Sequence, residues 1–91
     1  MSVTVRIPTP LRTLTGGVSE VTVEPGSLEA VVKAVEAAHP GVAARVLDES
    51  GALRRFVNVY VGDEDVRFLE GLATEVADGQ SVSIIPAVAG G

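Results

Sequence analysis

Apolar and polar residues alternate in four stretches of the chain. The stretches are residues 3–7, 18–23, 56–61 and 82–85. A period of two places alternate side chains on opposite faces of an extended backbone, which is typical of β-strands with one buried face. Gly16-Gly17 supplies a permissive backbone for a turn between the first two stretches. The pattern therefore predicts four principal strands.

A helical period replaces the alternation after Pro25-Gly26. The apolar positions follow the spacing i, i+3, i+4 and i+7, and they are Leu28, Val31, Val32 and Val35. This spacing places them on one stripe of a helix. Ser27 can cap its first turn, and Pro40 ends the helix because it disfavours helical backbone at His39. We expect this to be the main helix.

The remaining segments give weaker patterns. Residues 42–47 can form one further short helical turn, and residues 62–65 read as a polar turn. Val66 and Phe68 alternate with polar neighbours, which predicts a short strand. Residues 69–76 have no period, and we expect an irregular connection there.

The predicted order is strand, strand, helix, strand, short strand, strand. This order predicts an α+β fold: a mixed sheet with one main helix packed on one face. The chain has 91 residues, a normal length for one domain. We expect the domain to span residues 1–86. Residues 87–91 carry no pattern and are expected to form a flexible, extended tail.

Composition narrows the possible functions. The chain has no cysteine, so disulfides, thiolate metal sites and thiol catalysis are excluded. Its net charge of −5 argues against nucleic acid as a partner. No stretch approaches the roughly 20 apolar residues of a membrane helix, and the first residues do not resemble a signal peptide. We therefore expect a cytoplasmic protein that binds neither nucleic acid nor membrane.

The region from residue 56 to 91 carries a resemblance to a known family. It reads FVNVYVGDEDVRFLEGLATEVADGQSVSIIPAVAGG. With the order of the elements and the opening VTVRIPTPLR, it resembles the ubiquitin-like β-grasp sulfur carriers of the MoaD, ThiS and CysO group. The CysO branch is the most similar, and the likeness covers nearly the whole chain.

The resemblance implies a carrier rather than an enzyme, with no catalytic residues, bound cofactor or metal of its own. An adenylating enzyme of the MoeB/ThiF type would use ATP to activate the terminal glycine carboxylate. Sulfur would then replace AMP, leaving a thiocarboxylate. By this resemblance Gly91 would bear the adenylate and then the sulfur, and Gly90 would precede it in the tail.

The resemblance leaves the sulfur acceptor open. The CysO branch implies a pyridoxal-phosphate cysteine synthase, with a metalloprotease-like hydrolase that releases cysteine. The other branches imply molybdopterin synthase, or enzymes that make thiamin or thiosugars. Two further functions stay open: a ubiquitin-like covalent modifier, and a binding subunit whose tail enters a partner without being modified.

The tail has a composition that suits entry into an active site. Glycine has no Cβ, so Gly90 and Gly91 leave the acyl carbon uncrowded. The five residues Ala87, Val88, Ala89, Gly90 and Gly91 can reach roughly 17 Å when extended. We expect them to thread into a partner enzyme.

The alternation also predicts a docking face. If Val57, Val59 and Ile84 face the helix, their neighbours line the other side of the sheet. These neighbours are Phe56, Asn58, Tyr60, Ser83 and Ile85. An exposed sheet face with aromatic and aliphatic side chains can form an apolar contact patch. In the alternative, loops cover this face.

Three groups of polar residues are not expected to act chemically. Asp63-Glu64-Asp65 is expected to be a solvated turn, since consecutive carboxylates on a turn point apart. His39 is expected to interact with the carbonyl groups at the end of the helix. The Arg54-Arg55 pair could touch an acidic partner, although a hydrated loop is the expected state.

Overall fold

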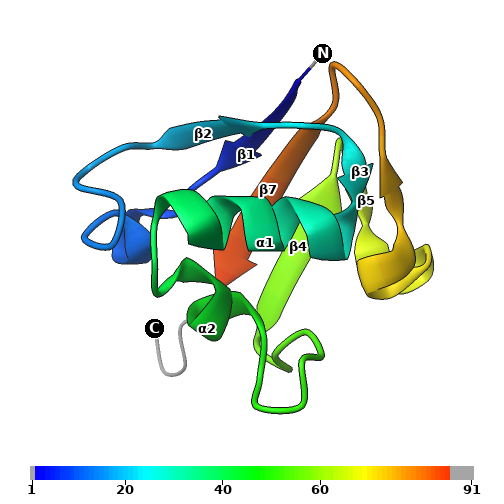
Figure 1. Ribbon diagram of the computed structural model, residues 1–91. Coiled ribbons are helices and arrows are strands. Elements are labelled where there is room, and N and C mark those ends of the chain that lie inside the picture. The colour runs from blue at the N-terminus through cyan, green and yellow to red at the C-terminus, as the bar shows by residue number, and fades with distance from the viewer. Residues whose placement is uncertain (1, 87–91) are drawn as a thin grey trace.

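The computed structural model describes residues 2–86, and residues 1 and 87–91 lie outside the description. A five-stranded sheet forms one layer, and a long helix lies across one face of it (Figure 1). In sheet order the strands are β2 (Glu20–Val23), β1 (Val3–Arg6), β7 (Ser81–Pro86), β4 (Val57–Val61) and β5 (Glu64–Asp65). β1 and β7 run parallel, and the other neighbours are antiparallel. The predicted mixed sheet is therefore confirmed.

The helix α1 (Leu28–Ala38) covers the sheet with the predicted apolar stripe. All four stripe residues are buried, Leu28 completely. They pack against inward-facing valines such as Val5, Val59 and Val82, which are also buried. Most of this core is β-branched, which suits side chains that pack on a pleated sheet.

Both ends of α1 match the sequence pattern. The Ser27 hydroxyl accepts a hydrogen bond from the backbone N–H of Ala30 at 3.2 Å, as expected of a cap. At the other end, the backbone N–H of His39 donates to the carbonyl of Val35. With 11 residues α1 is too short to cross a bilayer, and no other helix in residues 2–86 is long and apolar enough to do so.

A second short helix, α2 (Val42–Val46), follows after one tight turn. Gly41 makes this turn with a φ of 103°, a conformation that residues other than glycine rarely adopt. The Glu36 carboxylate accepts hydrogen bonds from the backbone N–H groups of Gly41 and Ala43, at 3.0 and 2.9 Å. An anion at this end of α2 satisfies N–H groups that have no partner within the helix. The predicted short helical turn is thus confirmed.

The predicted short strand at Val66 and Phe68 is wrong. Residues Val66–Phe68 form a 3-10 helix, η2, and the short strand β5 lies earlier, at Glu64–Asp65. Gly62, with a φ of 62°, permits a tight turn, so the chain pairs with β4 at once. The Asp65 carboxylate then accepts from the backbone N–H of Arg67 at 2.8 Å, and this cap turns the chain into η2.

The connection at residues 69–76 is more regular than expected. It contains a 3-10 helix, η3 (Gly71–Ala73), and the strand β6 (Glu75–Val76). β6 pairs with β3 (Gly26–Ser27) as a separate two-stranded ladder. A third 3-10 helix, η1 (Thr9–Leu11), lies between β1 and β2. These short elements line the edges of the core and leave the five-stranded sheet as the scaffold of the site.

Candidate functional site

The last described strand, β7, lies in the middle of the sheet between β1 and β4. Pro86 ends this strand and stands opposite Val57 of β4. The predicted tail follows Pro86 directly in the sequence. Its residues, Ala87, Val88, Ala89, Gly90 and Gly91, lie outside the described residues. What the structure places is therefore the root of the tail: β4 pairs with β7 as far as Pro86, whereas β1 pairs with β7 only from Ser81 to Ser83.

The outer face of the sheet, defined here as the face away from α1, carries four of the predicted docking residues. Asn58 stands opposite Ile85, and Tyr60 stands opposite Ser83. The residues between them along both strands are buried, so the predicted alternation is confirmed. Ile85 is 49% exposed, and the other three are partly exposed. Docking through this face stays a prediction.

Phe56, the fifth predicted docking residue, lies outside the strand. β4 begins at Val57, and Phe56 belongs to the preceding turn with 64% of its surface exposed. Phe68 in η2 is 88% exposed, although the sequence analysis did not include it in the face. Two large aromatic side chains are therefore open to solvent on segments next to β4.

Arg67 holds the turn that carries Phe56, a role that sequence reasoning missed. Its guanidinium donates to the side-chain oxygen of Asn58 at 2.6 Å. It also donates to the backbone carbonyls of Arg54 at 2.7 Å and Val57 at 2.8 Å. Charge-assisted bonds of this kind are stronger than neutral ones. The Asn58 side chain, predicted for docking, thus already has a partner within the chain.

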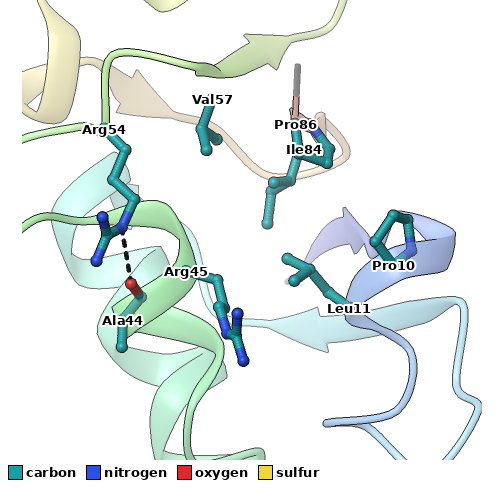
Figure 2. A pocket seen from close by; sticks show the side chains of 8 residues that line it. All are labelled: Pro10, Leu11, Ala44, Arg45, Arg54, Val57, Ile84 and Pro86. Atoms are coloured by element: carbon teal, nitrogen blue, oxygen red, sulfur yellow. Dashed lines mark hydrogen bonds between the residues drawn. The ribbon is translucent and has the colours of Figure 1, made fainter. Parts of the chain in front are cut away.

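A groove of about 550 Å³ opens beside the root of the tail. Figure 2 shows Leu11, Val57 and Ile84 directed toward its interior. Its remaining lining residues are Pro10, Ala44, Arg45, Arg54 and Pro86. The dashed line in the figure is a hydrogen bond of 2.9 Å from Arg54 Nε to the carbonyl of Ala44. The groove thus combines an apolar floor with two arginines.

The loop that leads to Arg54 is ordered by one carboxylate. The Asp48 carboxylate accepts from the Ser50 hydroxyl at 2.6 Å and from the backbone N–H of Ala52 at 3.1 Å. The Ser50 bond contributes most to lowering the pKa of Asp48, and nearby Arg54 contributes least. The ionised form that makes these bonds is therefore favoured at neutral pH.

Comparison with known protein families shows which family this chain belongs to. The profile of the ThiS family matches residues 5–91, almost the whole chain. The chain belongs to the ThiS family. The resemblance identified from the sequence is therefore confirmed.

Relatives of this ThiS family chain are similar over its full length. The sulfur carrier protein CysO of Mycobacterium tuberculosis is 56% identical over 93 residues, covering 100% of both chains. The crystal structure of the Amycolatopsis orientalis BexX/CysO complex matches with 52% identity and a TM-score of 0.92, covering 98% of this chain and 99% of that one. Small archaeal modifier protein 3 of Haloferax volcanii is 41% identical over 61 residues, 67% of this chain and 65% of that protein.

These likenesses confirm the ubiquitin-like β-grasp fold and support a sulfur-carrier role. Sulfur carriers act as substrates of other proteins rather than as enzymes. Within residues 2–86, no three histidine or carboxylate side chains cluster closely enough to hold a metal ion. The described feature with an evident relation to such a role is the root of the tail at Pro86, with the surfaces around it.

Proposed function

We propose that this protein carries sulfur as a thiocarboxylate on Gly91. The observation that carries the proposal is the full-length likeness to CysO sulfur carriers, together with the Gly90-Gly91 sequence that follows the central strand. The sheet supports this role because β7 is its central strand and pairs with β4 as far as Pro86. A rigid root lets a short tail be aimed at a partner's active site.

The chemistry proceeds in two steps. A carboxylate is a poor electrophile, since attack would add charge to an anion. An adenylating enzyme of the MoeB/ThiF type therefore joins a carboxylate oxygen of Gly91 to the α-phosphate of ATP, and pyrophosphate leaves. Sulfide, or a persulfide sulfur with a thiol reductant to cleave its S–S bond, then attacks the acyl carbon. The carbon–oxygen bond to AMP breaks, and the thiocarboxylate remains.

The tail suits this chemistry because its last two residues lack side chains. A Cβ at either position would widen the chain where it enters a confined site. The five residues reach roughly 17 Å when extended, enough to pass from the docked domain to a buried reacting centre. Ordering them costs about 1–2 kcal/mol per residue, so contacts of the folded domain with the partner must offset that cost.

The proposed acceptor of the sulfur is a cysteine synthase-like enzyme in the cytoplasm, with a metalloprotease-like hydrolase to release the product. Similarity to CysO supports this choice over molybdopterin synthase or enzymes of thiamin and thiosugar formation. The BexX/CysO complex shows that a 52% identical carrier docks with another protein. The domain and its tail thus act together, one for docking and the other for chemistry.

A second candidate function is covalent modification of other proteins. It is favoured by the 41% identity to small archaeal modifier protein 3. Both functions begin with the same activated carboxylate and differ in the nucleophile that attacks it. An amine of a target protein would give an amide, whereas sulfide gives the thiocarboxylate.

The intact mass of the protein isolated from cells separates these functions. We expect a fraction with a mass about 16 Da above the acid, because sulfur has replaced oxygen. A covalent modifier would instead appear attached to whole proteins. A binding subunit whose tail is never modified would show only the acid.

The outer face of the sheet gives a separate prediction. Ile85→Glu should weaken binding to the adenylating enzyme by about tenfold or more, because it places a charge in an apolar contact. Val18→Glu is the matched control, since Val18 is similarly exposed, at 42%, but lies before the edge strand β2. Isothermal titration of each variant with the enzyme measures the change. Equal affinities for Ile85→Glu and the control would exclude this face as a docking surface.

A further inference from the structure

Two hollows flank the end of β7, one on each side of the tail root. The groove described above contains Arg45 and Arg54. A second hollow of about 330 Å³ contains Arg6 and Arg12, and both hollows share Ile84 and Pro86. Arg6 belongs to β1 and stands opposite Ser83 of β7, which places it on the outer face. The four arginines therefore surround the point where the tail begins, and we call them the arginine collar.

Four arginines gathered at one place are unusual for a chain with a net charge of −5. The sequence has 12 acidic residues against seven lysines and arginines. Four of those seven lie in the collar. No aspartate or glutamate in the described part of the chain lines either hollow. Positive charge is thus concentrated at the root of the tail, while the molecule as a whole is acidic.

Two members of the collar are held in place by the backbone. Arg12 Nε donates to the carbonyl of Ile7 at 3.1 Å, and Arg54 Nε donates to Ala44 at 2.9 Å. Within residues 2–86, the terminal nitrogens of these two guanidinium groups have no hydrogen-bond partner. Such groups can bind a carboxylate in two-point geometry without first losing an internal bond.

The other two members are open to solvent. Arg6 approaches Glu20 at 3.9 Å, with both side chains more than half exposed, so this contact is weak. Arg45 forms no ion pair or side-chain hydrogen bond with any described residue, and Figure 2 shows its side chain beside the groove. Replacement of Arg45 therefore breaks no described ion pair or side-chain hydrogen bond, and replacement of Arg6 removes only the weak contact with Glu20.

We propose that the arginine collar docks onto an acidic rim around the opening through which a partner protein receives the tail. This inference rests on the proposed function. The tail starts at the centre of the collar and is five residues long. A protein that encloses its last residues must bring its own surface to within roughly 17 Å of Pro86. Carboxylates around that opening would face the four arginines and fit their charge.

The collar also sets how the partner is approached. Complementary charge around a narrow opening raises the association rate and orients the tail toward the opening. Both effects are stronger at low salt, where the charges are less screened. The apolar floor between the arginines, formed by Leu11, Val57 and Ile84, can take an aliphatic side chain of the same rim. The partner surface inferred here therefore has carboxylates around a protruding apolar residue.

Replacing the two open members tests the collar. The double variant Arg6→Glu/Arg45→Glu should bind the MoeB/ThiF-like adenylating enzyme at least about tenfold more weakly than wild type in low salt. The difference should shrink in about 0.5 M salt, where charges are screened. The control is the double variant Lys33→Glu/Ala37→Glu on α1. It also adds negative charge, in a similar amount, but away from the collar. Titrations at both salt concentrations measure the affinities.

Binding of the collar variant, the α1 variant and the wild type to the enzyme decides whether the collar docks. Loss of binding in the collar variant and not in the α1 variant supports the collar. Equal binding, or an equal loss in both variants, overturns it, as does salt-independent binding of the wild type. Collar-dependent binding to a single-stranded RNA oligonucleotide, with none to the enzyme, would overturn the choice of partner. The proposed function is judged separately, by whether the wild type gains about 16 Da with enzyme, ATP and sulfide.

Discussion

Deletion of Gly91 is expected to abolish sulfur loading and to leave thermal unfolding unchanged. The adenylating enzyme must hold the terminal carboxylate at attack distance from ATP. In a tail shortened by one residue, the carboxylate ends about 3.5 Å short of that position. The described core lies between Val3 and Ile84, so it does not include the deleted residue. Intact mass after incubation with enzyme, ATP and sulfide measures the loading, and circular dichroism on heating measures the fold.

Two further variants show whether the position of the carboxylate matters. A chain extended by one alanine beyond Gly91 should also fail to load, because its carboxylate is displaced and carries a side chain beside it. Val88→Ala keeps both the length of the tail and its end, so it should load normally. Loading of the shortened or the extended chain at the wild-type rate would contradict the role given to Gly91.

Leu28→Ala is expected to destabilise the domain by about 3 kcal/mol, roughly a hundredfold in the unfolding equilibrium. Leu28 is fully buried between α1 and the sheet, and its removal leaves a cavity in a well-packed core. Domains of this size have only about 5–15 kcal/mol of stability, so the loss is a large share. Unfolding in urea, followed by circular dichroism, measures it.

Leu69→Ala is the control for this substitution. Leu69 is 40% exposed, so truncation should cost much less, within about 1 kcal/mol. The Leu28→Ala protein that remains folded should still accept sulfur, because its tail is intact. A loss of less than about 1 kcal/mol for Leu28→Ala would contradict the packing of α1 on the sheet described here.

The principal elements could be predicted because their signals are local. Strand alternation and the helical stripe depend on neighbouring residues, and the cap of α1 needs only Ser27 and the next turn. The pairing of β3 with β6 could not be predicted, since it joins residues about 50 positions apart through two residues each. The strand expected at Val66 failed for a different, local reason: the tight turn at Gly62 moved the pairing with β4 to earlier residues.

Some parts of the candidate site could likewise be predicted from local sequence patterns, and others could not. The tail is a prediction from its own sequence and lies outside the described residues, whereas the outer face could be predicted from alternation in two strands. The arginine collar carries no such signal, because its four members are far apart in the chain. They meet only when β1 and β4 flank β7 and the segments next to these strands fold over the end of the sheet. Arg67 is similar, since its carbonyl partners are Arg54 and Val57, ten or more positions earlier in the chain.

The central claim is that sulfur is carried on the carboxyl carbon of Gly91. Trypsin cleavage after Arg67 leaves residues 68–91 as one peptide, because no lysine or arginine follows. After incubation of the protein with adenylating enzyme, ATP and sulfide, we predict a gain of about 16 Da in this peptide, located on Gly91 by fragmentation. An unchanged mass for this peptide, or sulfur found on any other residue, would contradict the account.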